Sequence, residues 1–217
     1  MPRILAVADE VAEALYGEAL QRLRPDVIVS CGDLPFDYLE NLVTRAAVPL
    51  VYVPGNHDPD LARVARHLAM WPAPVMTVAD DVPGPQGCEN ADGGVVAAAG
   101  LRFAGLGGSV RYKVGPHQYT QQQMRWRALR LEARLRVRRA LLGQALDVLV
   151  AHAPPLDLGD GGDPAHRGFA ALHGLVARVR PRLLLHGHVH PFHRRQPDRT
   201  LGTTRVVNVI PYRLIEL

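Results

Sequence analysis

Cysteine is scarce in this sequence, because its 217 residues include only Cys31 and Cys88. Two cysteines that lie outside any C-x-x-C pair are too few for the disulfide framework of a small secreted domain. We expect two reduced, partly buried thiols that behave as small hydrophobic side chains.

Long apolar runs are also missing. No stretch approaches the roughly 20 apolar residues that a membrane-spanning helix requires, and the N-terminal segment carries Asp9 and Glu10 where a signal peptide has its hydrophobic region. We therefore expect no membrane partner and a cytoplasmic location. The composition, 47% hydrophobic and 21% charged, is ordinary for a globular chain, and the length fits one domain over residues 1–217.

Lysine is nearly absent, since Lys113 is the only lysine among 25 lysine and arginine residues. The formal net charge of +4 and the isoelectric point near 9.4 therefore depend on arginine. We interpret this as a feature of the overall composition rather than a basic patch that binds one partner. It is weak support for nucleic-acid binding.

Short apolar runs alternate with helical patterns in the first third of the chain. The runs cover residues 4–8, 27–30 and 50–53, and the helical patterns cover residues 11–23, 36–45 and 60–69. This βαβαβ order predicts parallel strands covered by helices. Further on, VVAAAG-LRFAGLGG reads as two strands around a tight turn at Gly100, which predicts a hairpin that begins a second sheet.

The second half of the chain begins with a long helical pattern over residues 120–142 that carries seven arginines between apolar residues. We expect an amphipathic surface helix with a solvated basic face. The alternative is a phosphate-rich or acidic partner that lies along this helix. The following elements are predicted strands over 146–151, 182–186, 205–209 and 212–216, with a helix over 169–179.

Five predicted strands end in side chains that can bind a metal. Asp9 follows the first strand, and the other four strands run into CGD (31–33), GNHD (55–58), AHAPP (151–155) and HGHVH (186–190). Because the carboxyl ends of parallel strands meet at one edge of a sheet, we expect these residues to converge. Such a mixed oxygen and nitrogen set suits Mn, Fe, Zn or a similar divalent ion. The glycines before Asp33, Asn56 and His188 would allow a close backbone approach.

This series of motifs resembles the calcineurin-like metallophosphoesterase superfamily, whose pattern is D-x-H, G-D, G-N-H-[D/E], H and G-H-x-H. The resemblance covers almost the whole chain in the same order. It implies an α/β fold, a four-layer αββα sandwich of two mixed sheets flanked by helices, with the metal site at the carboxyl ends of the strands. HAPPLDLGD and His166-Arg167-Gly168 are further similar to cyclic-nucleotide phosphodiesterase-like members.

The resemblance also implies roles for individual residues. Asp33 would bridge two metal ions, Asp9 and His190 would hold the first ion, and Asn56, His152 and His188 would hold the second. His57 would stabilise or protonate the leaving oxygen, with Asp58 orienting it. The implied reaction is hydrolysis of a phosphodiester or phosphomonoester by a hydroxide that the two ions share. The implied partner is a phosphate-ester substrate, with a nucleotide-like one as an option.

The remaining histidines are not predicted to bind a metal ion. His117 and His166 are candidates to face the substrate, His67 and His173 are expected to be ordinary helix residues, and His186 is expected to support the ligands or lie in the core.

One position departs from the family pattern, because Val11 stands where D-x-H has its histidine. Three protein ligands still suffice for a catalytic metal. We therefore expect weaker metal binding at the first site rather than loss of activity, with Glu10 as a candidate to replace the missing ligand.

Two other functions stay open: a non-catalytic scaffold, and a nuclease that uses the basic helix over 120–142, whose binding would weaken with salt.

Overall fold

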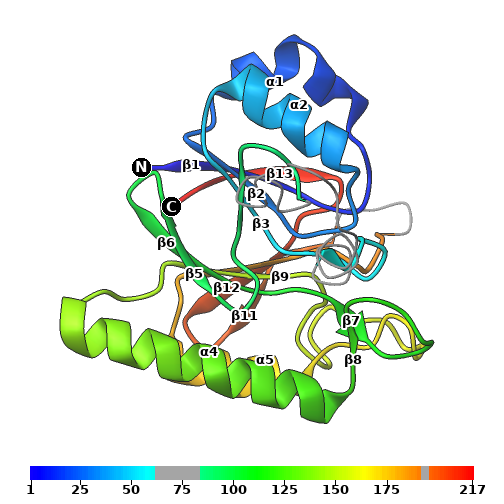
Figure 1. The fold of residues 1–217 in the computed structure, drawn as a ribbon, viewed down its shortest axis with the longest axis vertical. Coiled ribbons are helices and arrows are strands. Elements are labelled where there is room, and N and C mark those ends of the chain that lie inside the picture. The colour runs from blue at the N-terminus through cyan, green and yellow to red at the C-terminus, as the bar shows by residue number, and fades with distance from the viewer. Residues whose placement is uncertain (62–83, 192–195) are drawn as a thin grey trace, which may run out of the picture.

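The computed structural model describes residues 1–61, 84–191 and 196–217. Two β-sheets pack face to face, and helices cover the outer side of each sheet (Figure 1). The four-layer αββα arrangement predicted above is therefore confirmed. The predicted helix over 60–69 and His67 lie outside the described residues.

The first sheet holds the N-terminal strands and has the order β13-β1-β2-β3-β4. Its strands are β1 (Arg3–Val7), β2 (Val27–Ser30), β3 (Leu50–Tyr52), β4 (Cys88–Asn90) and β13 (Tyr212–Glu216). β1 to β4 are mutually parallel, and β13 runs antiparallel to β1. The register aligns Val7, Ser30 and Tyr52 across β1, β2 and β3, so the loops that follow these strands leave the sheet at the same edge.

The second sheet has the order β11-β12-β10-β9-β6-β5. Its strands are β5 (Val95–Ala98), β6 (Leu101–Leu106), β9 (Val148–Ala151), β10 (Leu183–His186), β11 (Arg199–Leu201) and β12 (Thr204–Asn208). The four central strands are parallel, and the two edge strands are antiparallel to their neighbours. The predicted hairpin is confirmed: β5 and β6 join at Ala99 and Gly100, which both have positive φ, as a two-residue I′ turn requires.

Within the described residues, three helical segments cover the first sheet and two cover the second, and Figure 1 shows the α-helices on the outer sides of the two sheets. The first group is η1 (Glu13–Tyr16), α1 (Glu18–Leu23) and α2 (Phe36–Ala46), and the second is α4 (Gln121–Leu142) and α5 (Ala170–Val179). The single helix predicted over 11–23 is wrong in its continuity, because Gly17 has extended backbone angles and separates a 3₁₀ turn from a short α-helix. A small two-stranded sheet, β7 (Ser109–Val110) and β8 (Gln118–Tyr119), lies before α4.

Alternating side chains of the central strands fill two different layers. Ile4 and Ala6 of β1 point into the core between the sheets, where Phe103 of β6 is also fully buried. Leu5 and Val7 point to the opposite side, against α1 and α2. Both faces of the central strands are therefore buried, which explains their continuous apolar runs in the sequence.

The arginine-rich helix α4 packs on the second sheet through a buried stripe that includes Met124, Leu131 and Leu135. Arg127 is not solvated as predicted, because it makes a two-pronged ion pair with Asp92, with N to O distances of 2.5 and 2.6 Å. Further arginine contacts join Arg134 to the Gly93 carbonyl, and Arg136 and Arg178 to Glu132. The outward face also carries exposed apolar side chains, namely Trp126, Leu129, Val137, Leu141 and Leu142. This face is therefore mixed rather than purely basic.

Across residues 1–61, 84–191 and 196–217, the structure contains no helix with the length and apolar character needed to cross a membrane.

Candidate metal centre

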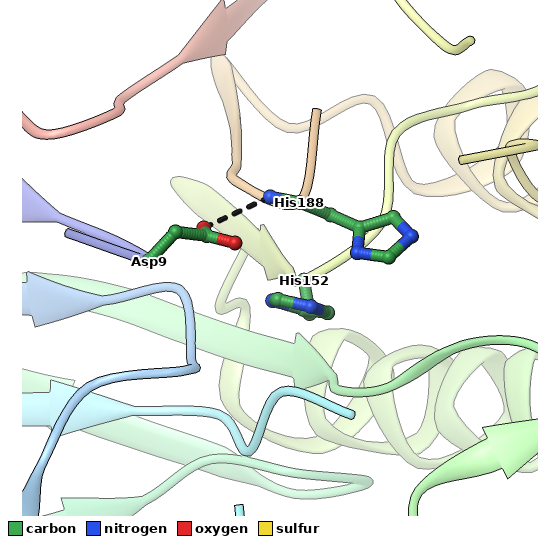
Figure 2. Close-up of side chains that lie close together, drawn as sticks. All are labelled: Asp9, His152 and His188. Atoms are coloured by element: carbon green, nitrogen blue, oxygen red, sulfur yellow. Dashed lines mark hydrogen bonds between the residues drawn. The ribbon is translucent and has the colours of Figure 1, made fainter. Parts of the chain in front are cut away.

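The polar strand ends of both sheets meet at one edge of the sandwich. Asp9 follows β1, and His152 and His188 follow β9 and β10 of the other sheet. Their potential ligand atoms all lie within 4.8 Å of one another. Figure 2 shows the three side chains gathered around a common space, with Asp9 approaching from one sheet and the two histidines from the other. The predicted convergence of these three residues is confirmed.

Asp33 and Asn56 join this group through His152. The Nε2 atom of His152 lies 3.0 Å from Asn56 Oδ1 and 3.3 Å from Asp33 Oδ2. The opposite ring nitrogen, Nδ1, lies 2.8 Å from the carbonyl oxygen of Cys31. Donation from Nδ1 to that carbonyl fixes the ring so that Nε2 faces the side-chain oxygens of Asn56 and Asp33.

Two tight turns with unusual backbone angles connect the sheets. Asp9 has a φ of 62° and lies at the centre of a γ-turn that the Glu10 N–H closes on the Ala8 carbonyl at 2.6 Å. His188 has a φ of 66° at the centre of a similar turn, in which the Val189 N–H donates to the Gly187 carbonyl at 2.8 Å. The His188 N–H then donates to Asp9 Oδ2 at 2.9 Å, the dashed line in Figure 2. Such conformations persist where the surrounding structure holds them, and they concentrate at functional sites.

The glycines that precede the candidate ligands are sterically required. A Cβ atom on Gly55 would lie 2.0 Å from Asp33 Oδ1, and one on Gly187 would lie 2.1 Å from Asp9 Oδ2. Gly32 has a φ of 95°, and its Cβ would lie 2.3 Å from the backbone nitrogen of Gly55. The predicted close approach of the backbone at these three positions is confirmed.

The electrostatics of the centre favour a positive charge on the His152 imidazole. Burial alone would lower the pKa of His152, but its hydrogen bond with Asp33 and the charges of Asp9 and Asp33 raise that pKa to about 9. Burial, together with the charge of the neighbouring His152, lowers the pKa of His188 to about 3. Burial also raises the pKa of Asp9, against the opposing charge of His152.

These residues fit a divalent cation. The donor set combines carboxylate, amide and imidazole groups without a thiolate ligand, which suits Mn, Fe, Zn or a similar ion. A cation between His152 Nε2, Asp33 and Asn56 would take the place of the proton that the carboxylates otherwise stabilise on this imidazole. Asn56 Nδ2 is buried and has no hydrogen-bond partner among the described residues, so this N–H donor can pair with an acceptor oxygen, such as that of water or a phosphate.

His190 lies at the more open side of the centre. Its Nε2 atom is 3.8 Å from Asp9 Oδ1, and its Nδ1 atom is 2.8 Å from Glu10 Oε1. Val11 is half-buried and packs against the hydrophobic cluster beneath α1 and α2. The side chain at position 11 therefore belongs to the outer layer, and Glu10 joins Asp9 in contacting His190.

His57 is exposed. It lies next to Asp33, since its backbone N–H donates to Asp33 Oδ1 at 2.7 Å. Asp58 is buried, and its Oδ2 accepts hydrogen bonds from the N–H groups of Gly55 at 2.7 Å and Asp33 at 3.1 Å. Asp58 thus ties the loop after β3 to the loop after β2. That Asp58 also orients the His57 ring stays a prediction.

Of the two histidines predicted to face the substrate, His166 lies beside the centre and His117 contacts the loop after β3. His117 Nε2 lies 3.1 Å from the carbonyl oxygen of Pro59, so its ring contacts the loop that carries His57. His166 lies beside His188, with ring centroids 5.4 Å apart and the rings tilted by 41°, and its Nδ1 lies 2.8 Å from Asp163 Oδ2. Contact of either ring with a substrate stays a prediction.

The other described histidines have structural contacts. His173 Nε2 lies 2.7 Å from the Leu156 carbonyl, which agrees with an ordinary helix residue. His186 is buried, its Nδ1 lies 3.0 Å from the Gly187 carbonyl, and burial lowers its pKa to about 4. Sequence reasoning missed the carbonyl oxygens that hold two of the histidine rings, that of Cys31 for His152 and that of Ala165 for His188. A backbone carbonyl leaves no signal in residue type.

Comparison with known proteins identifies the family of this chain. The profile of the family described as calcineurin-like phosphoesterase matches residues 5–192. The chain therefore belongs to the calcineurin-like phosphoesterase family, and the resemblance predicted from the motifs is confirmed. No curated protein matches the chain in a sequence comparison.

Several solved structures share the fold. One crystal structure superposes with a TM-score of 0.61 at 18% identity and covers 96% of this chain and 90% of its own. The protein TT1561 of Thermus thermophilus has a TM-score of 0.61 at 20% identity, with 95% of this chain and 88% of its own covered. A candidate 5′-nucleotidase from Staphylococcus aureus, solved in complex with alpha-ketoglutarate, has a TM-score of 0.51 at 13% identity. In that pair 95% of this chain but 48% of the other is covered.

Replacing Gly187 by alanine should damage the centre, because the added Cβ would lie 2.1 Å from Asp9 Oδ2 and 2.6 Å from Ala8 Cβ. We expect Gly187→Ala to displace the Asp9 turn and to lower both the metal content and the midpoint of thermal unfolding. Gly94→Ala is the matched control, since its Cβ would meet only ordinary contacts at 3.7 Å and beyond. Metal content measured by elemental analysis after loading with Mn²⁺ checks this, and equal metal content in both variants would contradict it.

Proposed function

We propose that this chain hydrolyses phosphate esters in a reaction that depends on divalent metal ions bound at the shared edge of its two sheets. The observation that carries the proposal is the cluster of Asp9, His152 and His188, with potential ligand atoms within 4.8 Å. The family match over residues 5–192 supports the same class of reaction.

We assign the candidate ligands to two ions. Asp33, Asn56, His152 and His188 would hold one ion, which we call the second site, and Asp9, Asp33 and His190 would hold the other, the first site. Bound divalent ions would neutralise phosphate charge and make a water nucleophile available near neutral pH. The contacts of His152 with Asn56 and Asp33 support the second assignment, and the approach of His190 to Asp9 supports the first.

The protein's own acid would be His57. Its exposed position and the hydrogen bond from its backbone to Asp33 support a role beside the centre and outside the ligand cluster. An imidazole at that position can donate a proton to the leaving oxygen as the ester bond breaks. Asp58 would keep the loop in place through its contacts with Gly55 and Asp33.

The substrate would bind against the loops over 107–119 and 154–168, which flank the centre and contribute His117 and His166. The S. aureus neighbour described as a candidate 5′-nucleotidase supports a nucleotide-like phosphate ester. A phosphodiester and a phosphomonoester both fit this class.

The contacts of α4 do not favour the nuclease alternative. Arg127, Arg134 and Arg136 are engaged with Asp92, Gly93 and Glu132, so part of the predicted basic face serves protein packing. A non-catalytic scaffold is separated from an enzyme by the experiments that follow.

Hydrolysis should require a divalent metal, with Mn²⁺ or Fe²⁺ the expected activators. We expect metal-stripped protein to be inactive towards a panel of bis-aryl phosphodiesters, phosphomonoesters and cyclic nucleotides, and we expect added Mn²⁺ to restore turnover of at least one of them. Full activity in stripped protein with a chelator present would refute the metal requirement. Inactivity of the loaded protein on every substrate class would favour the scaffold.

His57→Ala should lower kcat by roughly 10²–10⁴-fold, the usual contribution of a general acid, while the variant keeps its bound metal. Glu13→Ala is the control, because Glu13 is an exposed residue of η1 and has no role in the proposed reaction. Metal content and kcat are measured on the same samples. If His57→Ala loses metal and activity in parallel, its role as an acid outside the ligand set is wrong.

The two ions should bind unequally, because the first site lacks the nitrogen donor of the family pattern at position 11. A titration with Mn²⁺ should show one tight and one weaker ion, with Asp9→Ala mainly removing the weaker ion and His152→Ala the tight one. Val11→His should not tighten the weaker site, since Val11 packs under α1 and α2. Two equally tight ions in the unaltered protein would contradict this assignment.

A further inference from the structure

The three histidines assigned to the metal ions share one arrangement: each has one ring nitrogen against an oxygen partner, which leaves the other nitrogen for the centre. His152 Nδ1 lies 2.8 Å from the Cys31 carbonyl, and His188 Nε2 lies 2.8 Å from the Ala165 carbonyl. His190 Nδ1 has a side chain as its partner, since it lies 2.8 Å from Glu10 Oε1. Ligand histidines in metal sites commonly donate their second N–H in this way.

His190 depends on this partner more than the other two histidines do. His152 and His188 are buried, so packing also holds their rings. The side chain of His190 is 46% exposed and that of Glu10 is 51% exposed. The contact with Glu10 is therefore the main restraint that turns His190 Nε2 towards Asp9 Oδ1, 3.8 Å away.

The turn at Asp9 places Glu10 rather than Val11 beside the ligands. The γ-turn closed by the Glu10 N–H and the Ala8 carbonyl reverses the chain directly after β1. Val11 then enters the hydrophobic cluster beneath α1 and α2. The Glu10 side chain therefore stays at the surface of the centre, within hydrogen-bond distance of His190.

We propose that Glu10 is a positioning residue of the first metal site: its carboxylate accepts the Nδ1–H of His190, which fixes the tautomer that presents Nε2 to the metal. A carboxylate partner also makes the imidazole a stronger donor. This offsets part of the loss of a nitrogen ligand at position 11. The inference rests on the proposed metal-dependent function and adds a residue that does not itself bind the metal.

The test compares Mn²⁺ titrations of the unaltered protein, Glu10→Ala, Glu10→Gln and the control Glu13→Ala, which removes a carboxylate from the neighbouring η1 turn. We expect Glu10→Ala to weaken the weaker ion by about 10–100-fold, the usual effect of removing such a partner, and to leave the tight ion unchanged. Glu10→Gln should recover most of this loss, because its amide oxygen still accepts the Nδ1–H. Glu13→Ala should match the unaltered protein.

The ¹⁵N chemical shifts of His190 in metal-free protein give a second readout. We expect the tautomer with the proton on Nδ1 in the unaltered protein and in Glu10→Gln, and a mixture of tautomers in Glu10→Ala. Unchanged affinity and tautomer in Glu10→Ala would overturn the inference, and so would a Glu10→Gln variant as weak as Glu10→Ala, which would make Glu10 a ligand. A protein that binds no Mn²⁺ at all would overturn the proposed function, and this inference with it.

Discussion

The hydrogen bond from the His188 N–H to Asp9 Oδ2, at 2.9 Å, brings the two sheets together at the centre and fixes the position of the Asp9 carboxylate. It joins the loop after β1 to the loop after β10, and both residues hold positive φ angles in γ-turns. The bond is possible only because Gly187 has no Cβ in the space that the carboxylate fills. The central strands, parallel within each sheet, bring the ligand loops to this edge, and the glycines at 32, 55 and 187 allow the loops to come into contact.

The charges of the centre follow from this close approach. Asp9 and Asp33 lie in largely buried positions next to His152, and together they raise the pKa of that imidazole to about 9 despite its burial. A buried site with this preference for positive charge suits a cation. The histidines are held by oxygen partners on their outer side, and the opposite ring nitrogen of His152 faces Asn56 Oδ1 and Asp33 Oδ2. The donor set is therefore preorganised.

Much of this could be predicted from the sequence, because parallel strands make distant strand ends meet. Asp9, His152 and His188 were predicted from that rule alone, and the glycines at 32, 55 and 187 were predicted from the need for close backbone approach. The break at Gly17 was missed, since helical periodicity continues across it. Short strands such as β7 and β8 have too few residues to show a period.

The contacts that depend on turn geometry could not be predicted. Sequence reasoning left Glu10 as one candidate replacement for the missing ligand, whereas the γ-turn at Asp9 determines that Glu10 contacts His190 and that Val11 packs outward. The contacts of Asp58 with two backbone amides likewise have no signal in the motif GNHD. Residue type indicates which side chains can serve the site, and the local turn decides which of them reach it.

Anomalous diffraction from crystals of Mn²⁺-loaded protein tests the central claim most directly, because it locates the ions without reference to activity. The account predicts two peaks that share Asp33, a strong one beside Asn56, His152 and His188, and a weaker one beside Asp9 and His190. A loaded crystal with no peak at this edge of the sheets, or with its peaks at other residues, would contradict the account.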